Sequence, residues 1–125
     1  MRRDSSDKEW RQVKKRIKSR DNNKDRLLRV LTVKEALILQ KNASKAQLNK
    51  LDAAHIYPVS THPGLVYEDC NIVLLNRYSH ENLDNCRCPL TGNFISMEER
   101  NKWWERICGE SQWRKLHKAL KNRKP

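Results

Sequence analysis

The chain contains 125 residues, of which 37% are hydrophobic and 34% charged, and its formal net charge is +12. This length suits one domain with a modest core, and the single Phe indicates that solvated elements flank that core. No apolar run approaches the roughly 20 residues that cross a bilayer, and no apolar segment follows the first basic residues. We therefore expect a cytoplasmic protein without a membrane partner.

The positive charge is concentrated in two segments. Residues 1–29 contain 12 Lys and Arg against 5 Asp and Glu, residues 98–125 contain 9 against 4, and residues 30–97 contain 6 against 6. Basic arms around a neutral centre favour a polyanionic partner, because each neutralised phosphate releases condensed counterions. Double-stranded DNA is the leading candidate. RNA is less favoured, since the sequence shows no aromatic platform for stacking single-stranded bases.

The first predicted element is an amphipathic helix over residues 7–19. Trp10, Val13 and Ile17 recur at helical spacing between basic residues, and Asp7 or Ser6 is the expected cap. The basic face of this helix is expected to contact phosphates. The next apolar stretch, LLRVLTVKEALILQKN, mixes leucine with β-branched residues, and we interpret it as a strand that passes into a helix.

The centre of the chain predicts a strand at 51–57, a loop at STHPG, a second strand at 71–75 and a helix that begins at Ser79. A turn at PLTGN follows. The next helix is expected over residues 96–107, since Ser96 and Glu99 form a capping box. A last basic helix follows in the tail, with its apolar positions at Trp113, Leu116 and Leu120.

Three polar residues stand in this strand, strand, helix frame. His55 lies in LDAAHIYP, Asn71 begins NIVLL, and His80 lies in the first turn of the helix that starts in SHENLD. This ordered set resembles the HNH family of nucleases, closely over residues 51–85. The resemblance implies an α+β fold, a mainly helical chain around a central ββα-metal motif with a two-stranded antiparallel hairpin.

The resemblance also implies a single nuclease domain over 1–125, with a basic helical arm at 1–29, the metal core at 51–85 and basic helices at 96–125. The expected activity is metal-dependent hydrolysis of DNA phosphodiester bonds, as a nick by a monomer or a double-strand cut by a homodimer. The small size and the lost zinc positions are similar to phage-encoded HNH enzymes, which would place the protein in a bacterial host cytoplasm, where it could join larger phage machinery. The alternatives are an inactive HNH-fold DNA-binding module and an accessory subunit of a nucleic-acid machine.

The residue types suit this chemistry. His55 is the expected general base, because an imidazole titrates close to neutral pH. By resemblance, Asn71 would orient the loop and the base, and His80 would bind one Mg²⁺ or Mn²⁺ ion. Asp84 lies four residues after His80, on the same face of the predicted helix. Candidate DNA contacts are Arg77, Lys14, Lys15, Lys18, Arg114, Lys115 and Lys118.

The sequence departs from the commoner HNH pattern beside the base. Many members have Asp or His just before the base histidine as a metal ligand, whereas this chain has Ala54. Asp52 is the next acidic residue, but it lies one pleat back, roughly 6–7 Å along the strand. We therefore expect Asp52 to reach an ion on His80 only through a β-bulge.

A second departure concerns structural zinc. The positions that hold zinc in many HNH proteins are occupied here by Asp25, Leu28, Asn76 and Ser79, so a structural zinc is not expected. Cys86-Arg87-Cys88 is too tight for the usual zinc knuckle, and free thiols are expected. Packing must then replace the metal, and the candidates for this core are Leu27, Leu28, Leu31, Ile38, Trp103 and Trp104.

Overall fold

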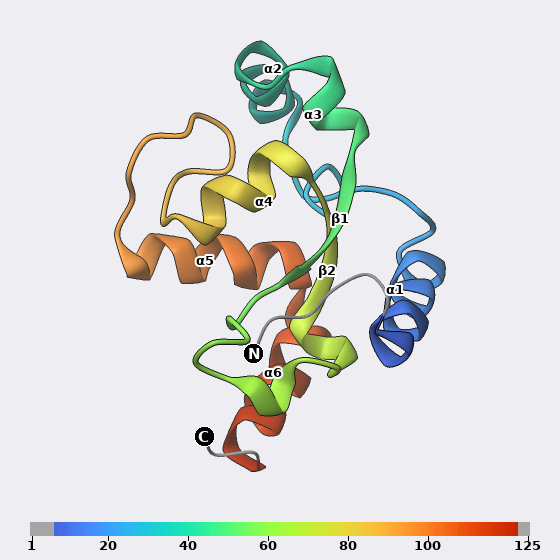
Figure 1. The fold of residues 1–125 in the computed structure, drawn as a ribbon. Helices are drawn as coiled ribbons and strands as arrows, with labels where there is room; N and C mark the ends of the chain where they lie inside the picture. Colours follow the sequence, from blue (N-terminus) through green and yellow to red (C-terminus); the bar gives the residue numbers. More distant parts are fainter. Residues whose placement is uncertain (1–6, 123–125) are drawn as a thin grey trace.

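The computed structural model describes residues 7–122, which form six α-helices and a two-stranded antiparallel sheet (Figure 1). The expected α+β class and antiparallel hairpin are confirmed. No helix within the described range is long and apolar enough to span a bilayer. The elements are α1 Lys8–Arg20, α2 Val33–Asn42, α3 Lys45–Asn49, β1 Leu51–His55, β2 Ile72–Asn76, α4 Arg77–Asp84, α5 Met97–Cys108 and α6 Glu110–Asn122, with short 3₁₀ turns at Pro63–Leu65 and Asp69–Asn71.

The hairpin separates two groups of helices, with α1 on one side and α4 and α5 on the other (Figure 1). β1 and β2 pair in regular register from Leu51 opposite Asn76 to His55 opposite Ile72. Alternate residues of β2 therefore face opposite ways. Ile72 and Leu74 pack with the buried side chains of α1, which are Trp10, Val13 and Ile17. The spacing of these three residues predicted that they share one apolar face. Val73 and Leu75 of β2 face the main core.

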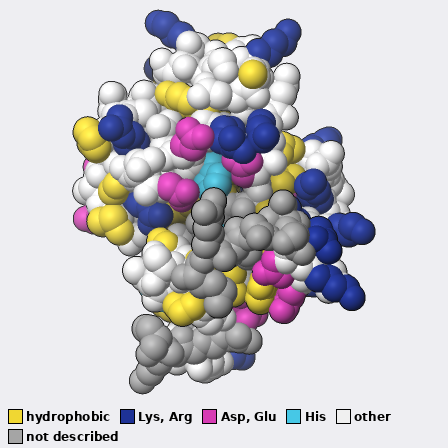
Figure 2. Space-filling view, in the orientation of Figure 1, with side chains coloured by type: hydrophobic (Ala, Val, Ile, Leu, Met, Phe, Trp, Pro, Cys, Tyr) yellow, Lys and Arg dark blue, Asp and Glu magenta, His cyan; other side chains and the backbone are white. Residues whose placement is uncertain are grey.

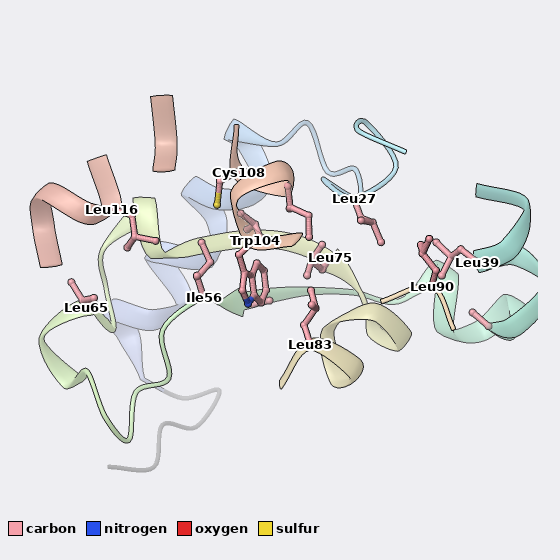
Figure 3. Packing of buried hydrophobic residues seen from close by; sticks show 14 residues of the cluster. Leu27, Leu39, Ile56, Leu65, Leu75, Leu83, Leu90, Trp104, Cys108 and Leu116 are labelled. Atoms are coloured by element: carbon pink, nitrogen blue, oxygen red, sulfur yellow. The ribbon is translucent and has the colours of Figure 1, made fainter. Parts of the chain in front are cut away.

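The main core surrounds Trp104, which is fully buried beside Ile56, Leu75 and Leu83 (Figure 3). Of the residues expected to replace a zinc site, Leu27 and Trp104 are fully buried, and Leu31, Ile38 and Trp103 are partly buried against the same cluster. The prediction for Leu28 is wrong, because its side chain is 52% exposed. The cysteines are free thiols, as expected.

Three of the positions that the resemblance assigns to zinc meet in a buried hydrogen-bonded cluster. The Asn76 side-chain amide donates to Asp25 Oδ2 at 2.7 Å and to Ser79 Oγ at 3.1 Å. The Asn76 Oδ1 accepts from the Ser79 backbone N–H at 2.8 Å. Burial raises the pKa of Asp25 above its usual range. Hydrogen bonds therefore join segments 51 residues apart in the chain.

Replacing Asn76 by alanine is expected to lower the free energy of unfolding by about 2–4 kcal/mol, because Asp25 loses a buried donor and α4 loses its cap. Urea denaturation measures this change. Asn101→Ala, at an exposed position of α5, is the matched control and should change stability by less than about 0.5 kcal/mol. Equal stability of the two variants would contradict a stabilising role for the cluster.

Asp21 is a second buried junction, only 1% exposed. It accepts hydrogen bonds from Arg20, from Arg26 and from the Leu74 backbone N–H. Burial disfavours the carboxylate, but these donors outweigh that cost and hold the pKa of Asp21 below its usual range. The junction thus links the end of α1 to the middle of β2.

Asp21→Asn is expected to destabilise the protein by about 3–5 kcal/mol at pH 7, since it breaks a buried ion pair. A depressed folded-state pKa gives stability that is present above the ordinary Asp pKa and is lost as pH falls through the folded-state value. The difference in melting temperature between wild type and Asp21→Asn should therefore shrink below about pH 4. A difference that stays constant down to pH 2 would contradict this reasoning.

Three local predictions are corrected, and one helix of the structure was not predicted. The strand expected at the start of LLRVLTVK is wrong, because this segment forms turns, with Val30 N–H bonded to Leu27 O, before α2 begins. Helix α4 begins at Arg77 with Asn76 as its cap, and not at Ser79. Helix α3 was not expected. β1 ends at His55, since the Tyr57 N–H bonds to the side chain of Asn71 and not to a ladder carbonyl.

Candidate functional site

His55 closes β1 and is fixed by the loop that follows. Its Nε2 lies 2.9 Å from the Val66 carbonyl oxygen. A carbonyl only accepts, so Nε2 carries the hydrogen in this contact and Nδ1 is the basic nitrogen of the neutral ring. The imidazole also stacks on the indole of Trp10, with ring centroids 5.0 Å apart and an interplanar angle of 20°. Its tautomer and its ring plane are therefore both set by neighbours.

Asn71 holds this loop in place. It is fully buried, and its amide bonds to backbone alone: Oδ1 accepts from Tyr57 N–H at 2.8 Å, and Nδ2 donates to Tyr57 O at 3.1 Å and to Leu65 O at 3.2 Å. These bonds tie the end of β1 to the turn that precedes Val66. Asn71 thus positions the carbonyl that orients His55, which is the kind of role the resemblance implies.

Helix α1 is joined to the same loop. Asp7 caps α1 through the Trp10 N–H at 3.1 Å, and its other oxygen accepts from the Tyr67 hydroxyl at 2.5 Å. Tyr67 follows Val66 directly, so a closed ring of contacts runs from His55 through the loop and Asp7 to Trp10. The helical spacing of Trp10 predicted only a core residue, and no signal in the sequence pointed to its stacking on His55.

A row of four charged groups lies at the other end of the hairpin. Arg77 binds both oxygens of Asp52, at 2.6 and 3.0 Å. His80 Nδ1 lies 3.0 Å from Asp52 Oδ2, and His80 Nε2 lies 3.2 Å from Asp84 Oδ2. Asp52 contacts the His80 ring at Nδ1 in the regular β1–β2 register, without a β-bulge. Because β2 is antiparallel to β1, α4 begins beside the start of β1, where Asp52 is already next to its first turn.

The ionisation of this row follows from its contacts. Burial opposes the charged form of His80, but hydrogen bonds to Asp84 and Asp52 outweigh it, so the pKa of His80 is raised. Burial likewise opposes the Asp52 carboxylate, and the bonds from Arg77 and His80 lower the pKa of Asp52 in spite of it. The two carboxylates that face its ring nitrogens thus favour the imidazolium form of His80.

Two of these groups could hold a divalent ion. The described residues contain no group of three or more His, Cys, Asp or Glu side chains already arranged around one metal position. Asp52 is locked by Arg77, whereas the side chain of Asp84 is 50% exposed and can move away from His80. His80 Nε2 and the Asp84 carboxylate are therefore the accessible donors, and Asp52 at Nδ1 would fix the imidazole from behind.

Two hollows adjoin on this face and share Ala53 and His80. The larger, about 490 Å³, also contains Lys14 and Lys18 of α1. The smaller, about 350 Å³, is lined in addition by His55, Asp84 and Arg100. Figure 2 shows a histidine exposed at the centre of the face between acidic side chains, with Lys and Arg side chains to its right over α1.

The predicted DNA contacts do not all gather at these hollows. Arg77 lines the larger one with Lys14 and Lys18, while Lys15 is exposed elsewhere on α1. The cations of α6 lie apart: Arg114 pairs with Glu110, Lys115 lines a different hollow beside Gln112, and Lys118 is exposed.

No protein-family model, curated protein or solved structure matched this chain. The function of the site is therefore inferred from its own geometry. The structure brings His55, His80 and Asp84 to one hollow and keeps Asn71 beneath the loop. It adds Arg100, which the sequence did not single out, because nothing in the spacing of α5 links that residue to β1.

Proposed function

We propose that the protein is a metal-dependent endonuclease of the HNH type that hydrolyses DNA phosphodiester bonds. The observation that carries the proposal is the shared hollow: His55, with its Nε2 on a backbone carbonyl, lines the same 350 Å³ space as the His80 and Asp84 pair. A hydrolase of this kind needs a base and a metal donor set on one substrate phosphate, and this hollow offers both.

His55 would remove the proton from the attacking water at Nδ1. The hydrogen bond from Nε2–H to Val66 O favours the resulting imidazolium, since the carbonyl dipole stabilises positive charge on the ring. Stacking on Trp10 adds a cation–π interaction to the charged form. The base is thus prepared to gain a proton without changing its position.

The donor set fits a hard divalent cation. A histidine nitrogen and one mobile carboxylate leave most of the coordination to water and to phosphate oxygens, which suits Mg²⁺ or Mn²⁺ better than a structural zinc. When bound, the ion would supply Lewis-acid stabilisation of the phosphate charge. His80 would give up its proton to bind, and Asp52 with Arg77 would keep its ring aligned.

Lys14 and Lys18 would place the DNA backbone. Both line the larger hollow, which continues from the smaller one through His80, so phosphates on either side of the cut could follow this path. Because each chain has, among its described residues, one such hollow with one candidate base, each chain would cut one DNA strand. The basic residues of α6 would bind a more distant part of the duplex.

A short DNA duplex labelled on each strand tests the proposed activity. Incubation with Mg²⁺ or Mn²⁺ should give labelled fragments, and EDTA should prevent them. Duplex that is retarded in a gel but stays intact with every metal would contradict the proposal.

The second candidate function is a DNA-binding module without catalysis. Ala54 is fully buried in the core, so its position offers no ligand, and both nitrogens of His80 already have partners. Metal distinguishes the two functions. An enzyme should show a rise in melting temperature with Mn²⁺ that His80→Ala removes, whereas a binding module should show none.

A further inference from the structure

Arg100 is a buried cation at the wall of the smaller hollow. It lies in α5, it is only 9% exposed, and it shares this hollow with His55 of β1 and with His80 of α4. Basic residues of this chain are mostly solvated, as the lysines of α1 and α6 are. Burying a guanidinium costs free energy unless its donors are used. The contacts of Arg100 therefore show which of its donors are used within the protein and which are available to a ligand.

One donor of Arg100 is anchored and the others are not. Its Nε–H donates to the Leu83 carbonyl at 2.7 Å, and its guanidinium lies 5.8 Å from the ring centroid of buried Trp104. Within residues 7–122, no hydrogen bond or ion pair engages its terminal nitrogens. Asp84 lines the same hollow but forms no ion pair with it. The guanidinium is held rigidly with its outer edge available to a ligand.

The outer edge of a guanidinium presents two parallel N–H donors, which match two oxygens of a phosphoryl group. We propose that Arg100 forms an anion site for a backbone phosphate in this hollow. Arg77 is less suited, because Asp52 accepts from its Nε and Nη2 and pairs with its charge. The identity of the bound phosphate as the one that is cleaved rests on the proposed nuclease function. The existence of the anion site is independent of that function.

Inorganic phosphate tests the site without any cleavage. Nuclear magnetic resonance of the metal-free protein should show saturable shifts of the Arg100 side chain and of amides in residues 53–59 and 80–84. Arg100→Gln should weaken phosphate binding at least about tenfold, because a charge-assisted bidentate contact is lost. Lys102→Gln, which removes one charge from an exposed position of the same helix, should bind phosphate like the wild type.

Two results would overturn the inference: phosphate binding by Arg100→Gln equal to that of the wild type, or shifts confined to the lysines of α1 and α6. If Arg100→Gln does not fold, the shift map of the wild-type protein decides alone. Phosphate binding at Arg100 in a protein that never cuts DNA would refute the nuclease and leave the anion site standing.

In the active enzyme, Arg100→Gln should lower kcat by about 10²-fold with KM changed only a few-fold, as expected for a donor that acts mainly on the transition state. An unchanged kcat would show that Arg100 does not contact the scissile phosphate. A merely structural Arg100 would lower the melting temperature without moving the phosphate shifts, so the two roles are separable.

Discussion

Replacing His55 by alanine is expected to lower the rate of metal-dependent DNA cleavage by about 10²–10⁴-fold, the usual contribution of a general base. Of the two histidines that line the smaller hollow, His80 is bound to carboxylates through both ring nitrogens, which leaves His55 as the proposed base. DNA binding should change little, since the cations of α1 remain in place. Nicking rates at saturating DNA measure the effect.

The matched control is His117→Ala, which removes an exposed histidine of α6 that contacts the Trp113 carbonyl. This variant should cut DNA at close to the wild-type rate. Equal rates for His55→Ala and His117→Ala would exclude His55 as the base. The hydrolytic water would then have to be activated elsewhere.

Asn71→Ala is expected to affect both stability and catalysis. The substitution leaves the Tyr57 N–H, the Tyr57 carbonyl and the Leu65 carbonyl without their side-chain partner in a fully buried place, which should cost about 3 kcal/mol. The loop that carries Val66 then loses its fixed position. A misplaced orienting carbonyl should reduce cleavage by on the order of 10²-fold even where the variant is fully folded.

Urea denaturation and nicking rates, both taken well below the melting temperature, separate these effects. The exposed Asn101→Ala variant again serves as the control. If Asn71→Ala were destabilised yet cut DNA at the wild-type rate, Asn71 would be a structural residue alone, and the orientation of His55 would not depend on it.

The parts of the fold that could be predicted are those with a local cause. The apolar spacing of Trp10, Val13 and Ile17 predicted α1, and the Ser96 and Glu99 pair predicted the start of α5. Helix α3, which was not predicted, carries the same kind of signal, a reciprocal cap between Ser44 and Gln47. Helix caps and periodicity are readable because they involve residues a few positions apart.

The candidate site was predicted in its members but not in its geometry. His55, His80 and Asp84 do share a hollow, but the approach of Asp52 to His80 depends on where α4 starts relative to the hairpin. The distance of one pleat between Asp52 and Ala54 runs along β1, whereas the contact of Asp52 with His80 runs from β1 to α4. The role of Arg100 depends on the packing of α5 against α4, which no local pattern encodes.

The most direct measurement is the conversion of supercoiled plasmid to nicked or linear DNA by the wild-type protein with Mg²⁺, with Mn²⁺ and with EDTA, beside His55→Ala. The structure leads us to expect cleavage that needs the metal and nearly disappears in His55→Ala. Plasmid that is bound but uncut in every lane would contradict the nuclease and favour the binding module.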